Sequence, residues 1–287
     1  MIDLSLWNQT LLSQWRMLPE LPLFGFLVGV ILGGLLASFL NVVVYRLPKM
    51  RYIQAAKRIR EQQGFVDNEP QFNLAFPSSN CPNCHHKIRW YENIPVFSWF
   101  LLWGRCSQCG SSISKRYPII EGVGAMMGAV FVIVLGDGVV ALLALCTAIT
   151  ILGIALILYD QVEVPGGLWV TLWSLALVVC FFRNPTVSDA IPALVLVAVV
   201  VVLNLLQLDS SRMFRVVFQL SAILVLWIDA QAAFNYMVIL GLLATILVIY
   251  KRFIDGSAYV STLNFERAVA FSSCIICITM LVIVAPT

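Results

Sequence analysis

The chain has 287 residues, of which 60% are apolar and 11% charged, and its mean hydropathy is +0.91. Water-soluble domains carry roughly a quarter charged residues, so this composition excludes soluble globular, disordered and coiled-coil proteins and predicts an all-α polytopic membrane protein. The formal net charge of +3 says little about partners. Its basic residues lack the aromatic platform of a nucleic-acid-binding surface, and no nucleic acid partner is expected.

The first predicted element is a membrane span at about residues 21–45, because a spanning helix needs roughly 20 apolar residues. We assign residues 1–45 to a periplasmic N-terminus and this first transmembrane helix. The span lacks a short apolar region followed by a small-residue cleavage site, and it runs into Tyr45-Arg46-Leu47-Pro48. A cleaved signal peptide is therefore not expected.

Residues 46–117 form a polar segment, predicted to be a cytoplasmic domain. It holds 11 of the 18 Lys and Arg residues and both His residues. Within it, the basic stretch at 49–60 is expected to meet the anionic lipid of the inner leaflet.

Two C-x2-C motifs lie in this domain, Cys81-Pro-Asn-Cys84 and Cys106-Ser-Gln-Cys109. Two residues between thiolates let both sulfurs of one motif reach the same tetrahedral ion, so the four cysteines predict a structural zinc site. Unpaired thiols or a transient disulfide are the alternatives. His85 and His86 are interpreted as bystanders or as replacement ligands.

Seven further spans are expected in residues 118–287, separated by short turns. They fall at about 118–135, 139–159, 167–182, 189–207, 214–230, 234–250 and 268–285. With eight spans and a cytoplasmic polar domain, 16 of the 18 basic residues lie on the inner side, as the positive-inside rule requires. Both termini are then expected outside.

Two aspartates stand out at predicted span ends on the cytoplasmic side, Asp160 and Asp209. Two carboxyls that meet in a partly dry site cannot both ionise easily, so one holds a proton while the other activates water. This arrangement is typical of an aspartic protease. The alternative is that both are ordinary interfacial charges, with Asp209 paired to Arg212 or Arg215.

Several ordered motifs resemble the type IV prepilin leader peptidase/N-methyltransferase family. They cover roughly residues 27–121 and read ASFLNVVVYRLP from Ala37, FNLAFPSSNCPNC from Phe72, RWYENIPVFSW from Arg89, GRCSQCG from Gly104 and ISKRYPIIE from Ile113.

The resemblance implies a bacterial inner-membrane enzyme with two activities. Members cleave the leader of type IV prepilins or type II secretion pseudopilins on the cytoplasmic side, and then methylate the new N-terminus with S-adenosylmethionine. It implies Asp160 and Asp209 as the catalytic pair, and zinc on Cys81, Cys84, Cys106 and Cys109. It assigns no residues of this chain to the methyl-donor site.

The second half departs from the family pattern. Asp160 is followed after four residues by Pro165-Gly166, where members usually have Pro-Asp after six. Matching Asp160 to the first catalytic aspartate therefore needs a two-residue deletion; otherwise Asp160 corresponds to a noncatalytic acidic position. Asp209 follows Leu206-Gln207-Leu208, where members have Gly-x-Gly. These departures leave an alternative open: a peptidase-inactive paralogue that binds prepilins or assembly proteins, or that retains methyl transfer alone.

Overall fold

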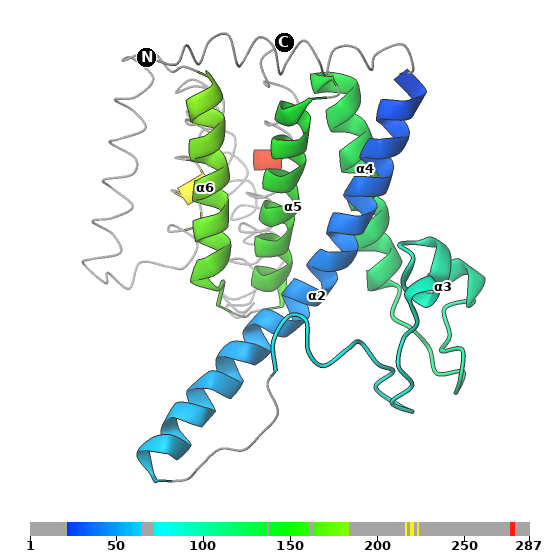
Figure 1. Cartoon of the computed structure of the whole chain (residues 1–287), viewed down its shortest axis with the longest axis vertical. Coiled ribbons are helices and arrows are strands. Elements are labelled where there is room, and N and C mark those ends of the chain that lie inside the picture. The colour runs from blue at the N-terminus through cyan, green and yellow to red at the C-terminus, as the bar shows by residue number, and fades with distance from the viewer. Residues whose placement is uncertain are drawn as a thin grey trace, which may run out of the picture. The chain divides into compact units, whose positions relative to one another are not determined.

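The computed structural model describes residues 22–64, 72–136, 138–160 and 163–183, together with positions 216, 219, 220, 223 and 276–278. In these residues the protein is mostly helical and contains no strands (Figure 1). Within the described ranges, three helices are long and apolar enough to cross a membrane, which supports the predicted membrane protein. Four of the expected spans, from 189–207 to 268–285, lie almost wholly outside the described residues.

Helix α2 spans Pro22–Gln62 and is much longer than the expected first span. The predicted span ended near Tyr45, at the end of the apolar run. A proline in a helix interior removes one hydrogen bond and usually ends or kinks the helix. Here the helix continues past Pro48. The residues beyond it are rich in strong helix formers, and Lys57 and Glu61 approach to 4.0 Å one turn apart.

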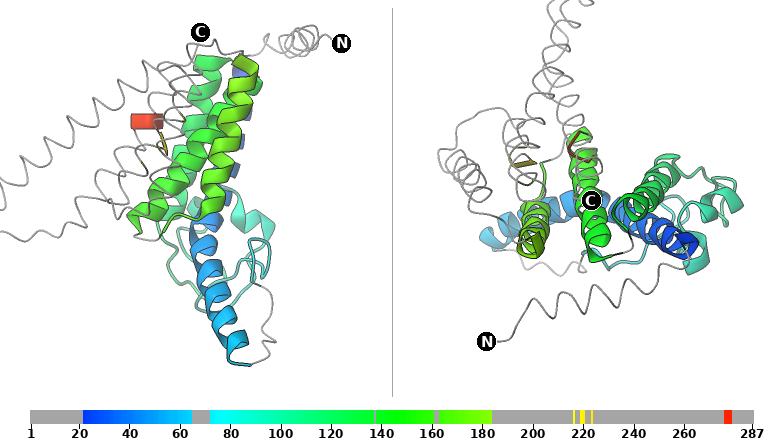
Figure 2. Two further views of the ribbon diagram at one scale, coloured as in Figure 1. Left: turned by 90° about the vertical axis from the view of Figure 1, so that its left-hand side faces the viewer. Right: turned by 90° about the horizontal axis from the view of Figure 1, so that it is seen from above.

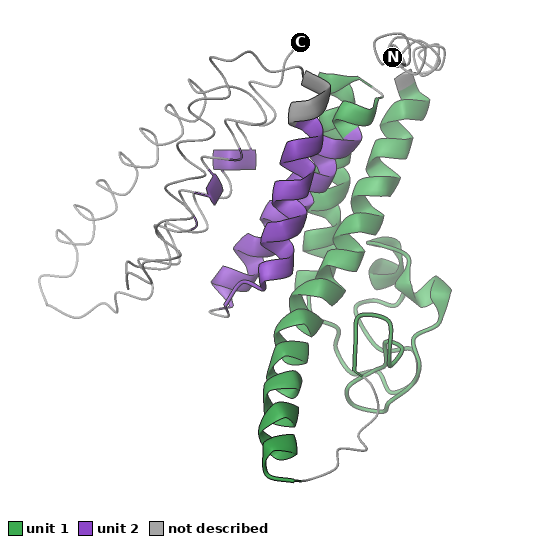
Figure 3. Ribbon diagram, turned by 60° about the vertical axis from the view of Figure 1, so that its left-hand side comes forward, with its two compact units in different colours: residues 1–141 green, residues 142–287 purple. Residues whose placement is uncertain are grey.

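Three further long helices follow, α4 (Arg116–Leu135), α5 (Val139–Tyr159) and α6 (Gly166–Arg183). Their bounds agree with the second, third and fourth expected spans to within two residues. The chain divides into two compact units, residues 1–141 and 142–287 (Figure 3).

Within the first unit, α2 and α4 pack side by side through glycine (Figures 1 and 2). A Cβ atom added at Gly29 would lie 2.6 Å from the carbonyl oxygen of Gly128, and one added at Gly33 would collide with the carbonyl of Gly124. Residue numbers rise along α2 as those of the facing residues fall along α4, from Gly29 opposite Gly128 to Gly33 opposite Gly124, so the pair is antiparallel. Glycine at every fourth position lets two helix backbones touch, which is a common way to hold helices together in lipid.

We predict that Gly128→Ala destabilises the α2–α4 pair by about 1–3 kcal/mol, because the new methyl group must push the two backbones apart. Thermal unfolding of the detergent-solubilised protein measures this effect. Gly122→Ala is the matched control, since nothing lies within 4 Å of a Cβ added there on the same helix. Equal melting temperatures for the two variants would contradict the close packing.

Candidate metal centre

The two C-x2-C motifs fold as matching tight turns, which we call knuckles. In the first, Cys81 donates its N–H to the carbonyl of His86 at 2.9 Å; in the second, Cys106 donates to Ser111 at 2.8 Å. The residue after each second cysteine, His85 or Gly110, has a left-handed φ of 58° or 71°. Glycine adopts this φ at little cost, and it turns the chain back beneath the two sulfurs.

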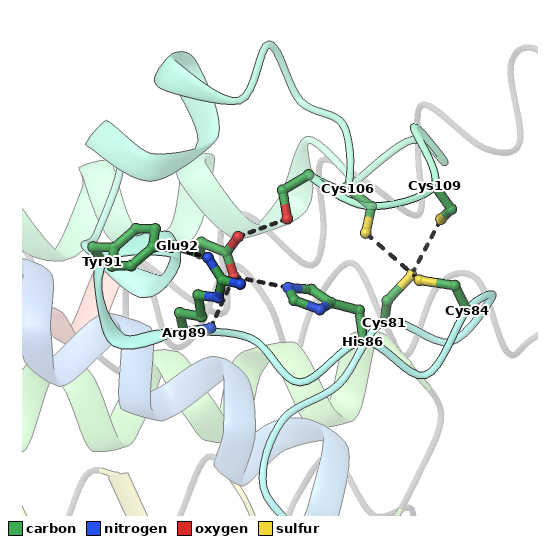
Figure 4. Close-up of polar contacts among 9 residues, drawn as sticks. Cys81, Cys84, His86, Arg89, Tyr91, Glu92, Cys106 and Cys109 are labelled. Atoms are coloured by element: carbon green, nitrogen blue, oxygen red, sulfur yellow. Dashed lines mark hydrogen bonds and ion pairs between the residues drawn. The ribbon is translucent and has the colours of Figure 1, made fainter.

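The knuckles bring the sulfurs of Cys81, Cys84, Cys106 and Cys109 together, and we call these four atoms the cysteine cluster (Figure 4). All four lie within 4.8 Å of one another, and two cross pairs lie at 3.8 and 3.9 Å. A tetrahedral ion bound at about 2.3 Å would hold its sulfurs about 3.8 Å apart. The donor set and its spacing therefore fit a closed tetrahedral metal site.

Hydrogen bonding and burial shift the pKa of three of the thiols, two of them downward and one upward. The hydroxyl of Ser111 is the largest cause in two cases, lowering the pKa of Cys109 to about 6 and, with backbone N–H groups of the first knuckle, that of Cys81 to about 7. The N–H of His86 lowers the pKa of Cys84, but burial and the three neighbouring thiols raise it to about 12. A divalent cation would favour the thiolate form of all four.

Glu92 ties the two knuckles together through its carboxylate (Figure 4). It accepts the backbone N–H of Arg89 at 2.8 Å and the hydroxyl of Ser107, between the second pair of cysteines, at 2.6 Å. Nε2 of His86, beside the first pair, lies 3.3 Å away. The Arg89 N–H, followed by the Ser107 hydroxyl, holds the pKa of Glu92 below its usual value. His86 is therefore a partner of Glu92, which the interpretation as a bystander missed.

Arg46 fixes the start of the loop that carries the first knuckle. Its buried guanidinium donates to the carbonyl oxygens of Asn73 at 3.0 Å and Pro77 at 2.7 Å. The Phe72 ring lies beneath it, 5.7 Å away, and beneath Lys49 at 5.1 Å. The first charged residue of α2 thus binds the loop through backbone atoms, which explains why the loop can keep its path without a sheet.

Glu121 fixes the loop at a second point. This buried carboxylate on α4 accepts the backbone N–H of Val96 at 2.7 Å. The neighbouring Pro95 packs against α2, where a Cβ added at Gly34 would lie 3.6 Å from it. Arg46, Pro95 and Glu121 all belong to the motifs that carry the family resemblance, and each has a positional role.

The predicted catalytic pair is described for one member. Asp160 is an exposed residue directly after α5, and its N–H donates to the carbonyl of Leu156 at 3.0 Å. Asp209 lies outside the described residues, so the pair stays a prediction.

The comparisons with known proteins agree with the motifs. Residues 31–135 match the family described as Bacterial Peptidase A24 N-terminal domain. The predicted resemblance to the prepilin peptidase family is confirmed. The matched region contains most of α2, the whole cysteine cluster and α4. No solved structure matches the chain significantly.

Three curated relatives are named prepilin leader peptidase/N-methyltransferase. The protein from Pseudomonas putida is 39% identical over 56% of this chain and 58% of its own length. Those from Pseudomonas aeruginosa and Stutzerimonas stutzeri are 46% and 49% identical, over 37% and 35% of both chains. The chain spans between about a third and three fifths of the curated relatives it matches.

Sequence reasoning missed Glu92 and the glycines of the α2–α4 pair as organising residues. The glycines had a readable signal, since Gly29 and Gly33, and likewise Gly124 and Gly128, have small-x-x-x-small spacing in apolar runs. Glu92 had none, because its partners lie before it and far after it in the chain.

We predict that Glu92→Gln weakens metal retention by the cysteine cluster about tenfold, the low end of the effect of removing an outer-shell carboxylate. The amide still accepts one hydrogen bond but loses the charge that holds both knuckles. Metal transfer to a chelator, followed in the purified full-length protein, measures the change. Glu61→Gln is the control, because Glu61 lies on α2 and pairs with Lys57. Identical transfer rates would remove Glu92 from metal retention.

Proposed function

We propose that this protein is a prepilin leader peptidase and N-methyltransferase of the bacterial inner membrane, with the cysteine cluster on the cytoplasmic side. Its substrates would be type IV prepilins or type II secretion pseudopilins, and its methyl donor S-adenosylmethionine. The observation that carries the proposal is the match of residues 31–135 to the peptidase family, together with the printed names of the relatives. The apolar helices support a membrane location.

Zinc is the metal we propose for the cysteine cluster. Four thiolates in a closed tetrahedral set are typical of structural zinc, which fills all its positions with protein ligands and leaves none for water. The cluster therefore has a structural role in this proposal: it joins the two knuckles. Cys81, Cys84, Cys106 and Cys109 would be the ligands.

For cleavage we propose Asp160 and Asp209 as an acid/base pair. One carboxylate would take a proton from water as its oxygen attacks the peptide carbonyl, and the other would give its proton to the departing amine. The exposed position of Asp160 at the end of α5 is compatible with access by a substrate.

A second candidate function is methyl transfer or prepilin binding without cleavage. Leu206 and Leu208 stand where the family has glycines, and a side chain there can obstruct a peptide backbone that must approach closely. This candidate keeps the first half of the protein functional and removes the peptidase.

Mass spectrometry of a prepilin coexpressed with the protein, in a host that lacks its own peptidase, separates the two. A mature and methylated N-terminus is expected. Asp160→Asn and Asp209→Asn should each leave the leader uncleaved, because an amide cannot exchange the proton, while metal content stays unchanged. An uncleaved leader with the folded, metal-loaded wild type would favour the second candidate, and cleavage by either variant would remove that residue from the mechanism.

We predict that Cys81→Ser lowers bound zinc strongly and makes the cysteine loop sensitive to protease. A serine hydroxyl is a poor zinc ligand, and the first knuckle loses its buried sulfur. Zinc analysis and limited proteolysis of the purified protein provide the measurement. Cys146→Ser, on α5, is the matched control and should bind zinc like the wild type; full zinc occupancy in Cys81→Ser would contradict the assignment.

A further inference from the structure

Residues 94–103 of the loop read Ile-Pro-Val-Phe-Ser-Trp-Phe-Leu-Leu-Trp and contain no charge. We call them the apolar loop segment. They include the short helix α3 (Phe97–Leu101). The sequence places this segment in a polar domain between two membrane spans, yet its large side chains are exposed in the described part of the protein: Phe97, Phe100, Leu101 and Trp103 are 63–86% exposed.

The opposite side of the segment packs inward. Trp99 donates its ring N–H to the carbonyl of Ile113 at 3.3 Å, and its ring leaves no room for a side chain at Gly104, where an added Cβ would lie 2.7 Å away. The segment thus has one face that packs on the residues flanking the second knuckle and one face of uncovered aromatic and aliphatic side chains. Exposed apolar patches of this kind usually mark a protein or membrane contact.

The depth of this face in the membrane can be estimated from the residues of α2 that the loop contacts. From Pro22 to Tyr45 it carries no charge and is about 36 Å long at 1.5 Å per residue, enough for the roughly 30 Å hydrocarbon core. The loop is bound at Arg46, the end of that run, but Pro95 lies against Gly34. Gly34 is twelve residues earlier, about 18 Å back along the helix. After leaving the end of the apolar run, the loop therefore returns at Pro95 to lie beside the apolar part of α2.

The backbone N–H groups of the segment have the internal hydrogen-bond acceptors that a non-helical chain needs in lipid. Each N–H in the hydrocarbon region needs an internal acceptor, because no water is available there. Pro95 has no N–H; Val96 donates to Glu121; Phe97 donates to the carbonyl of Pro95 and Ser98 to that of Ile94. The turn after α3 is bonded too, with Gly104 donating to Trp99 at 2.8 Å.

The neighbouring helix α4 carries an exposed apolar surface of its own. On α4 the exposed aliphatic residues recur at helical spacing and form one stripe: Ile119, Val123, Met126, Val130 and Ile133. Figure 1 shows α3 beside the first part of this helix, and the view from above in Figure 2 shows it beside the helix again. Exposed Arg89 and Arg105 flank the segment, as basic residues commonly do at an anionic membrane surface.

We propose that the apolar loop segment is a re-entrant anchor: it enters the lipid leaflet beside α2 and α4 and returns, so that the cysteine cluster is fixed at the membrane surface. Buried Glu121 is its attachment point, which accounts for a carboxylate within an apolar helix. Cys106 follows the segment by three residues, so the second knuckle cannot move away from the membrane. The occupant of the face is lipid acyl chain. This inference does not depend on either proposed activity.

Photolabelling of the full-length wild-type protein tests the anchor. The protein is placed in a bilayer of phosphatidylethanolamine and phosphatidylglycerol that contains a lipid with a diazirine in its acyl chain, and adducts are mapped by peptide mass spectrometry. We expect residues 97–103 to carry adducts at a yield comparable with that of exposed Leu27, Ile31 and Leu35 on α2.

Phe76 is the internal control for this experiment. It is 66% exposed, similar to Phe100, but lies next to Pro77, which binds Arg46 at the end of the apolar run. It should remain near background. The proposal would be overturned if residues 97–103 carried no lipid adducts while α2 was labelled. A photoreactive residue at position 100 and a water-soluble reagent would then show whether the segment contacts another part of the protein or water instead.

Discussion

The backbone contact between α2 and α4 is the constraint on which the first unit of this protein depends. Lipid provides no hydrophobic force between two apolar helices, so their association must come from packing and polar contacts. Gly29, Gly33, Gly124 and Gly128 allow backbone to meet backbone. Because the pair is antiparallel and in close contact, it fixes the positions of two charged residues nearer the loop: Arg46 on α2 and Glu121 on α4.

Those two charged residues then organise a loop that has little core of its own. Each is buried and each binds main-chain atoms: Arg46 binds carbonyl oxygens near Pro77, and Glu121 binds the N–H of Val96. A buried charge is costly unless it is hydrogen-bonded, so these contacts hold the loop at defined points. Between them, Glu92 joins the two knuckles, and the four sulfurs converge.

The metal centre and the proposed cleavage site lie in different parts of the chain. The family match ends at residue 135, and the cysteine cluster, α2 and α4 lie within it. The proposed catalytic aspartates, Asp160 and Asp209, lie beyond it. The proposed enzyme thus has its metal centre in the matched part of the chain and its cleavage site beyond it.

The sequence alone determined the membrane class, the bounds of α4, α5 and α6, and the four cysteines that meet, because hydropathy and C-x2-C spacing are local properties that survive any packing. It did not reveal that α2 runs through Pro48, since an isolated proline normally ends a helix and the favourable context follows it. Tertiary structure decided the roles of Glu92 and Glu121, whose partners are 15 and 25 residues away. It also decided the depth of residues 94–103: their apolar character is readable, but their place beside Gly34 depends on a chain that leaves α2 and returns to it.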